Sequence, residues 1–336
     1  MSRLRVGVVG AGTWGKNHVR TLAGMPEVEL AAVCDLSPDT RTRLAGQYPG
    51  VHMTESAADL LGRVDAVVIA STASTHAALG RQAVDAGIPA LIEKPFALTV
   101  ADAEGLAEAA ERAGVPLLVG HLLEYHPVVE RLGTMIQKGE LGDLYYLYSQ
   151  RVNLGQVRPD ENALWSFGPH DVSVALFLMG DAPVSVAAQG HSYLQRGIED
   201  VVFLTMKFAS GVVAHAQMSW LDPHKERRLT VVGSRQMAVF DDMASREKLR
   251  IYDKGIDRPD YVSYGESLSV REGDIYIPRV SNAEPLAVQL KHFVSVIRKE
   301  TEPRADAADG VRVVRVLEAA GQSLARDGAP VTLRGS

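Results

Sequence analysis

Three glycines near the start of the chain have the spacing of a phosphate-binding turn. Gly10, Gly12 and Gly15 follow the apolar run Arg5 to Val9 and open a segment with helical character. The first glycine permits a tight turn, the second lets backbone N–H groups approach a pyrophosphate, and the third lets the helix pack closely on the strand. The positive end of that helix would face the phosphates. We therefore expect a dinucleotide site at this turn.

An acidic residue follows the next apolar run. Asp35 comes directly after Val28 to Cys34. There its carboxylate could accept hydrogen bonds from the adenosine ribose hydroxyls and would repel a 2′-phosphate, so the sequence favours NAD over NADP. Thr13 and Trp14, which lie between the glycines, complete the predicted cofactor turn.

A lysine and a histidine farther along could assist the oxidation of a secondary alcohol by the bound dinucleotide. Lys94, in Glu93-Lys94-Pro95, follows the apolar run Ala90 to Ile92, and doubly wound sheets bind ligands at the carboxyl ends of their strands. Lys94 could hydrogen-bond the reacting oxygen and favour an alkoxide-like transition state, while His170 could accept the hydroxyl proton. Each also has a simpler interpretation: a surface lysine in a turn, and a histidine that caps a helix or fills a core.

Up to about residue 120 the chain alternates short apolar runs with helical segments. We expect strands at Arg5 to Val9, Val28 to Cys34, Ala66 to Ile69, Ala90 to Ile92 and Pro116 to Val119. Helical stretches include Lys16 to Ala23, His76 to Ala86 and Val100 to Ala113, the last with Thr99 as its N-cap. This alternation predicts an α/β fold, with a Rossmann doubly wound parallel sheet over residues 1–120.

Beyond residue 120 longer strands follow a helix at Pro127 to Lys138. We expect these strands at Leu144 to Leu154, Val184 to His191, Val201 to Phe208, Val212 to Trp220, Arg228 to Val232 and Met237 to Phe240. Turns at Ala209 to Gly211 and at Gly233 to Gln236 predict hairpins. Residues 121–336 are therefore predicted to form an α+β domain with a mostly antiparallel sheet.

The last third of this domain is less regular. Asp253 to Pro278 lacks periodicity, which predicts a long loop with functional or interface duties. Glu284 to Lys299 and Ala307 to Ala325 have the spacing of amphipathic helices.

Composition argues against several classes of function. The chain has 336 residues, 46% hydrophobic and 23% charged, as is typical of a globular protein. Its net charge of −6 argues against nucleic acid or an anionic membrane as the partner, and no apolar run approaches the roughly 20 residues of a membrane span. The histidines show no metal-ligand spacing, and the single cysteine excludes an internal disulfide. Without a signal-peptide pattern, we expect a cytoplasmic protein with no metal site.

Together with the glycine turn, Glu93-Lys94-Pro95 resembles the Gfo/Idh/MocA family of oxidoreductases. The resemblance covers nearly the whole chain, including the turn into the second domain at Gly120-His121. It implies that residues 121–336 form a substrate-binding domain with an open, largely antiparallel mixed sheet, and that the protein is a homodimer or homotetramer assembled through the exposed face of that sheet. It also implies that NAD contacts, besides the glycine turn and Asp35, the residues Ser71, Thr72, His76, Glu93 and Lys94.

Two positions depart from the usual pattern of this family and point to one of its branches. Ser166 stands where the family has an aspartate four residues before its active-site histidine, here His170, and Glu124 stands before Tyr125 where an arginine is frequent. Segments 121–127, 161–166 and 220–225 resemble dehydrogenases that oxidise nucleotide-linked sugars at C3. The resemblance implies a substrate such as UDP-N-acetylglucosamine or its uronic acid.

Such a substrate carries a diphosphate, so the second domain must supply cations or hydrogen-bond donors. Arg158, Asn153, Asn162 and Lys225 are candidates, Arg158 because a guanidinium binds phosphate or carboxylate bidentately, although each could be a solvated surface residue. Tyr125 and Trp165 could stack on the ligand or belong to the core, and Asp171 could orient a neighbour or cap a helix. The predicted substrate site consists of Tyr125, Asn153, Arg158, Asn162, Trp165, Ser166 and Asp171.

Two other functions stay open. An inositol or free-sugar dehydrogenase would share the cofactor site, although Ser166 and Glu124 depart from the usual pattern. A catalytically inactive, NAD-sensing regulatory protein would share the fold. The presence of both Lys94 and His170 favours an enzyme.

Overall fold

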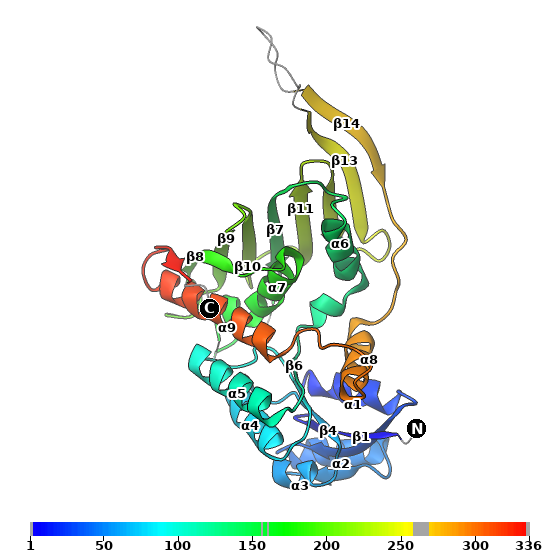
Figure 1. Ribbon diagram of the computed structural model, residues 1–336. Coiled ribbons are helices and arrows are strands. Elements are labelled where there is room, and N and C mark those ends of the chain that lie inside the picture. Colours follow the sequence, from blue (N-terminus) through cyan, green and yellow to red (C-terminus); the bar gives the residue numbers. More distant parts are fainter. Residues whose placement is uncertain (1–2, 156, 160, 258–268, 334–336) are drawn as a thin grey trace. The chain divides into compact units, whose positions relative to one another are not determined.

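The computed structural model describes residues 3–155, 157–159, 161–257 and 269–333, which form two compact units (Figure 1). Unit 1 combines residues 1–125 with 283–315, and unit 2 combines residues 126–282 with 316–336. Residues 283–315, predicted to belong to the second domain, therefore lie in unit 1. No helix among the described residues is long and apolar enough to cross a membrane.

Unit 1 is built on a parallel sheet, as the alternating pattern predicts. Its strands are β1 (Leu4–Val9), β2 (Val28–Cys34), β3 (His52–Thr54), β4 (Ala66–Ile69), β5 (Ala90–Ile92) and β6 (Leu117–Val119). They lie in the order β3-β2-β1-β4-β5-β6, with every pair parallel. The order reverses between β1 and β4, and sheets of this type bind ligands in the crevice at that point. Strand β3 was not predicted, because three half-buried residues give no periodic signal.

Helices pack on both sides of this sheet. They are α1 (Gly15–Ala23), α2 (Pro38–Gln47), α3 (Ala57–Leu61), α4 (His76–Asp85), α5 (Val100–Ala113) and α8 (Pro285–Ile297). Thr99 is confirmed as the N-cap of α5, since its side-chain oxygen accepts a 3.1 Å hydrogen bond from the Asp102 N–H. Leu290 and Phe293 of α8 lie in one buried cluster with Val19 and Leu22 of α1. This shared core explains why the late segment belongs to unit 1.

Unit 2 contains a nine-stranded mixed sheet. Its strands are β7 (Leu144–Val152), β8 (Pro183–His191), β9 (Val201–Phe208), β10 (Val213–Ser219), β11 (Glu226–Gly233), β12 (Met237–Asp241), β13 (Leu249–Asp257), β14 (Ser269–Tyr276) and β15 (Val331–Thr332). Their order is β14-β13-β12-β11-β7-β10-β9-β8-β15, and only β7 and β10 pair in parallel. The predicted hairpin turns join β9 to β10 and β11 to β12.

Two helices, α6 (Pro127–Gln137) and α7 (Ala163–Met179), lie along one face of this sheet (Figure 1). Met218 of β10 lies beneath Gly168 of α7, where a side chain would contact the methionine sulfur. The opposite face carries exposed aromatic side chains, among them Tyr146, Tyr148 and Phe203. Helix α9 (Ala307–Leu324) contributes residues to both units.

The predicted loop at Asp253 to Pro278 is wrong over most of its described length. Residues 253–257 belong to β13 and residues 269–276 form β14, its antiparallel partner; residues 258–268 lie outside the described residues. Nearly all side chains of β14 are exposed. A strand without a buried face shows no apolar alternation, so its sequence resembles that of a loop.

Candidate active site

The glycine turn has the shape that a diphosphate requires. Gly10 has a φ of +85°, and a side chain there would lie 2.6 Å from the backbone nitrogen of Ser71. A Cβ on Gly15 would collide with the backbone oxygen of Gly10, so the start of α1 packs directly on the turn. In contrast, a Cβ on Gly12 would meet no atom within 4 Å. The turn is therefore rigid at both ends and open in the middle, where phosphates would approach the backbone.

Asp35 is connected to this turn. One carboxylate oxygen accepts a 2.7 Å hydrogen bond from the Ala11 N–H, and the other accepts a 2.9 Å bond from the Ser37 N–H. A carboxylate oxygen can accept more than one hydrogen bond, so both can still receive ribose hydroxyls. Burial and the Asp35 charge raise the pKa of the preceding Cys34 thiol to about 11, which makes it a poor nucleophile.

The buried Glu93 side chain connects α1 to the turn at residues 93–95, here called the Lys94 turn. Its Oε1 accepts hydrogen bonds from Trp14 Nε1 at 2.7 Å and lies 2.8 Å from His18 Nε2, while Oε2 accepts a bond from the Lys94 N–H at 3.1 Å. Burial opposes ionisation of Glu93, but the bond and charge of His18 and the Trp14 bond outweigh it, and the pKa of Glu93 falls below its ordinary value. His18 was not predicted, because a histidine inside an amphipathic helix carries no sequence signal of its own.

His76 holds the other side of the same turn. Its Nδ1 lies 2.8 Å from the carbonyl oxygen of Pro95, and its Nε2 lies 3.1 Å from that of Ser71. The Lys94-Pro95 peptide bond is cis. Through His76, the segment after β4 and the segment after β5 are fixed to each other. The predicted cofactor residues of unit 1 thus gather at the carboxyl ends of neighbouring strands.

His170 lies near the middle of α7, and the predicted substrate residues around it have several roles. Asn162 is the N-cap of α7: its oxygen accepts a 3.1 Å bond from the Trp165 N–H, and its amide donates to Glu199 at 2.6 Å. Ser166 is buried one turn before His170 on the same helix. The side chain of Asn162 is therefore engaged in capping the first turn of the helix.

Asp171, the residue after His170, forms a buried ion pair with Arg151 of β7. The Arg151 Nε donates to its carboxylate at 2.8 Å. Arg151 faces Arg227 of β11 across the strand pair, and burial, followed by the Arg151 charge, lowers the pKa of Arg227. Arg151 was not predicted, since it stands in a strand where only tertiary contacts reveal its partner.

The remaining predicted residues are dispersed. Arg158 is half exposed and pairs with Glu161 at 3.1 Å. Asn153, directly after β7, has a buried Oδ1 without a hydrogen-bond partner among the described residues. Tyr125 belongs to unit 1, where it is buried and its hydroxyl donates to the Arg304 carbonyl oxygen at 2.7 Å. This contact favours the core interpretation of Tyr125.

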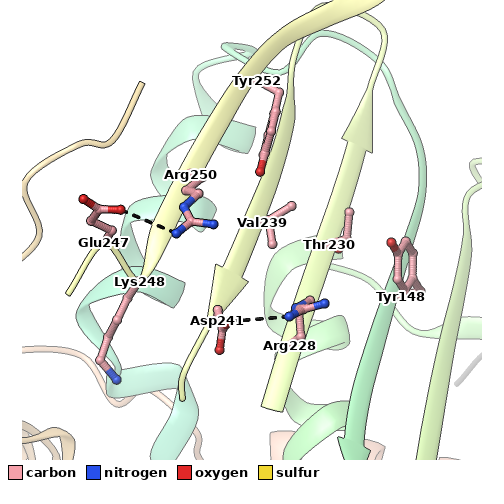
Figure 2. A pocket seen from close by; sticks show the side chains of 9 residues that line it. All are labelled: Tyr148, Arg228, Thr230, Val239, Asp241, Glu247, Lys248, Arg250 and Tyr252. Carbon is pink, nitrogen blue, oxygen red and sulfur yellow. Dashed lines mark hydrogen bonds and ion pairs between the residues drawn. The ribbon is translucent and has the colours of Figure 1, made fainter. Parts of the chain in front are cut away.

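A hollow of about 270 Å³ lies on the sheet of unit 2 (Figure 2). Tyr148 marks it as part of the exposed face, since the adjacent Leu147 and Ser149 are buried. Arg228 pairs with Asp241 at 3.6 Å, and Arg250 pairs with Glu247 at 3.4 Å. Arg151, three residues after Tyr148 on β7, instead faces α7, so this hollow is separate from the surroundings of His170.

Comparison with known proteins identifies the family. The profile "Oxidoreductase family, NAD-binding Rossmann fold" matches residues 4–121, and "GFO/IDH/MocA C-terminal domain" matches residues 129–239. The chain belongs to the Gfo/Idh/MocA family. Its unit 1 is accordingly the NAD-binding Rossmann domain, and this family member is an oxidoreductase.

Its relatives act on several sugars. D-apiose dehydrogenase of Paraburkholderia graminis is 27% identical over 99% of this chain and 91% of its own length. UDP-N-acetylglucosamine 3-dehydrogenase of Acidithiobacillus ferrooxidans is 28% identical over 95% of this chain and 96% of its own. A solved structure from Magnetospirillum magnetotacticum MS-1 has 33% identity and a TM-score of 0.81, covering 94% of this chain and 99% of that one. The chain is thus an NAD-dependent dehydrogenase of the sugar type.

Proposed function

We propose that this family member oxidises a secondary alcohol, the C3 hydroxyl, of a nucleotide-linked sugar such as UDP-N-acetylglucosamine or its uronic acid to a 3-keto sugar. The observation that carries the proposal is the Lys94 turn, which Glu93 and His76 fix at the carboxyl end of β5. The presence of Ser166 in place of the usual aspartate supports the nucleotide-sugar branch. The similarity to UDP-N-acetylglucosamine 3-dehydrogenase supports the same substrate class.

Lys94 and His170 divide the chemistry in this proposal. NAD, when bound, accepts hydride from the carbon that carries the hydroxyl. Lys94 hydrogen-bonds the reacting oxygen and stabilises the negative charge that develops on it. His170 takes the hydroxyl proton as the general base. The bonds from Glu93 and His76 to this turn restrict the backbone on either side of Lys94, which reduces the reorganisation needed during the reaction.

Some of the predicted substrate residues are proposed to contact the sugar nucleotide, and others to position the helix that carries His170. Asn153, Arg158, Trp165 and Ser166 are the candidates for contact with the sugar nucleotide. Arg158 can exchange its Glu161 partner for a phosphate, because the Arg158 side chain is half exposed and ion pairs near the surface are worth little. Asn162 and Asp171, whose side chains bind Glu199 and Arg151, act by positioning α7. For Tyr125, engaged with Arg304, we propose a role in the core rather than stacking.

We also propose that the enzyme is a homodimer or homotetramer assembled through the exposed face of the unit 2 sheet. The rings of Tyr146 and Tyr148 stack on that face with centroids 6.2 Å apart, and Phe203 is exposed on the same sheet. Exposed aromatic side chains on a wide sheet are typical of protein interfaces. Sedimentation of the wild type and of Tyr148→Glu tests this, since a monomeric wild type would contradict it.

The experiment that tests the function measures NADH formation at 340 nm with each sugar class. We expect turnover with UDP-N-acetylglucosamine or its uronate, and Lys94→Ala and His170→Ala should lose it while still binding NAD. A keto acid is included in parallel, so that a tightly held NADH can be reoxidised. Turnover with inositols or free hexoses and none with any UDP-sugar would contradict the proposal.

One observation favours a second candidate, a free-sugar dehydrogenase. D-apiose dehydrogenase matches 99% of the chain at nearly the same identity as the nucleotide-sugar enzyme. The same assay separates the two candidates. A regulatory protein without catalysis would bind NAD and oxidise neither class.

A further inference from the structure

Two buried polar side chains after β6 have no part in the chemistry above. His121 and Glu124 are 1% and 4% exposed, and Nδ1 of His121 lies 3.4 Å from Oε1 of Glu124. Within the described parts of the chain, neither ring nitrogen of His121 has a hydrogen-bond partner. Such groups are rare in protein interiors, because a buried donor or acceptor loses its bonds to water. The two ring nitrogens of His121 therefore have, in a buried place, hydrogen-bonding capacity that no described residue uses.

A third buried group lies beside them. Gln289 of α8 is fully buried, and its Nε2 donates to the Val119 carbonyl oxygen at 3.4 Å. The backbone N–H of His121 donates to the same oxygen at 2.8 Å. Over the residues described, Oε1 of Gln289 also has no hydrogen-bond partner. His121 and Gln289 thus both bond the Val119 carbonyl oxygen, and both carry buried polar atoms without a partner among the described residues.

The turn that carries His121 and Glu124 is firmly held. The guanidinium of Arg304 donates to the Glu124 carbonyl oxygen at 3.0 Å and lies 5.1 Å from the centre of the Tyr125 ring. The Tyr125 hydroxyl donates in turn to the Arg304 carbonyl oxygen at 2.7 Å. This double contact keeps the imidazole and the carboxylate facing each other.

The pair follows a strand next to the one that leads to Lys94. Ile92 of β5 pairs with Val119 of β6, and the Gly120 N–H donates to the Ile92 carbonyl oxygen at 2.6 Å. A Cβ on Gly120 would lie 2.9 Å from the Cα of Glu93, so the segments after the two strands are in contact. His121 therefore lies at the ligand-binding edge of the NAD domain.

We propose that His121 and Glu124 form a proton-binding couple linked to the oxidation state of the bound cofactor. The inference rests on the proposed function. In that reaction the O–H and C–H bonds of the alcohol break and a C=O bond forms. The hydrogen of the C–H bond leaves with both bonding electrons to the nicotinamide, which loses its positive charge. The hydroxyl proton leaves through the base to solvent, and a ring nitrogen of His121, beside the Glu124 carboxylate, takes up one proton.

The uptake of a proton by His121 follows from charge balance, because the residue is buried. The cofactor loses one positive charge and His121 gains one, so the total charge at this edge of the sheet is unchanged. Proton binding and the reduced cofactor therefore favour each other, and each raises the affinity for the other by the same factor. Among the described residues, the other titratable or charged groups around this turn include Glu93, Lys94, His126, His292, Arg304 and Asp306. Glu93, with its lowered pKa, keeps a constant negative charge over the neutral range.

The test titrates the protein with NADH, followed by its fluorescence, and with NAD in competition, from about pH 5 to pH 8, the range in which histidine side chains exchange a proton. We expect NADH to gain affinity relative to NAD as the pH falls, by up to tenfold per pH unit for one linked proton. In His121→Gln the ratio of the two dissociation constants should not depend on pH. In Glu124→Gln the dependence should move to lower pH, because the imidazolium loses its carboxylate. The matched control is His52→Gln on β3, at the opposite edge of the sheet, which should retain the wild-type slope.

A pH-independent ratio in the wild type, or a wild-type slope in His121→Gln, would overturn the inference. If His121→Gln is poorly folded by circular dichroism, Glu124→Gln decides the question through the direction of its shift. The titration uses no sugar. A wrong substrate class therefore leaves this result intact, and turnover of UDP-sugars without the linked proton would overturn only the role of His121.

Discussion

Replacement of Glu93 tests how the Lys94 turn is held. Its carboxylate receives bonds from Trp14 and the Lys94 N–H and lies 2.8 Å from His18 Nε2, all within 3.1 Å and in a buried site. Glu93→Ala leaves these groups without an acceptor, and removal of one partner from a buried charged network costs about 3–5 kcal/mol of unfolding free energy. Glu93→Gln keeps one acceptor oxygen but loses the charge, so we expect a loss of about 1–2 kcal/mol.

The stabilisation that Glu93 provides should depend on pH. The pKa of Glu93 is lowered in the folded protein from its ordinary value of 4.5, so the unfolded chain binds the proton more readily. The stabilisation is therefore complete above that ordinary value and is lost as the pH falls through the lower, folded-state pKa. The wild type and Glu93→Gln should thus converge in stability in acid.

Urea unfolding followed by circular dichroism measures these differences. The matched control is Glu104→Gln, which removes a partly exposed carboxylate paired with Arg315 at 2.7 Å and should cost less than about 1 kcal/mol. Two results would contradict this role of Glu93. One is that Glu93→Ala unfolds at the same urea concentration as the wild type, and the other is that the control loses as much unfolding free energy as Glu93→Ala.

Substitutions at three further sites separate binding from folding. Gly12→Ala should leave the urea midpoint unchanged, since its Cβ meets no atom, yet weaken NAD binding about tenfold or more by calorimetry; Gly15→Ala, whose Cβ meets the Gly10 oxygen, should fail to fold. Asn162→Ala should cost about 1 kcal/mol of stability through loss of the α7 cap, with KM changed less than threefold; a large rise in KM would instead make Asn162 a substrate ligand. Arg151→Met should destabilise the protein by about 3–5 kcal/mol by leaving the Asp171 carboxylate buried alone, and Arg151→Met with Asp171→Leu should recover most of it; no recovery would contradict a paired role.

The cofactor half of the site could be predicted because its signals are local. The turn requires a glycine at position 10, and the close packing of α1 on it requires another at position 15. Asp35 follows the next strand, so all these positions belong to one strand-turn-helix-strand unit that is continuous in the sequence. The same locality made Thr99 recognisable as a helix cap.

The rest depends on contacts between distant segments. His18 and Glu93 meet across 75 residues of sequence, and Arg151 finds Asp171 only because α7 packs on β7. β14 was predicted as loop, since a strand exposed on both faces has no apolar period. Residues 283–315 were predicted to lie in the second domain, but they belong to unit 1. The packing of α8 against α1 is a contact between distant segments, and nothing in the local sequence indicates it.

The measurement that most directly tests the central claim compares wild type and Lys94→Ala for NADH formation with UDP-N-acetylglucosamine and its uronate, together with NAD affinity by calorimetry. The account predicts turnover in the wild type, and in the variant a loss of turnover of roughly 100- to 1000-fold with NAD binding still measurable. Unchanged turnover in Lys94→Ala, or a wild type that oxidises free sugars and no UDP-sugar, would contradict it.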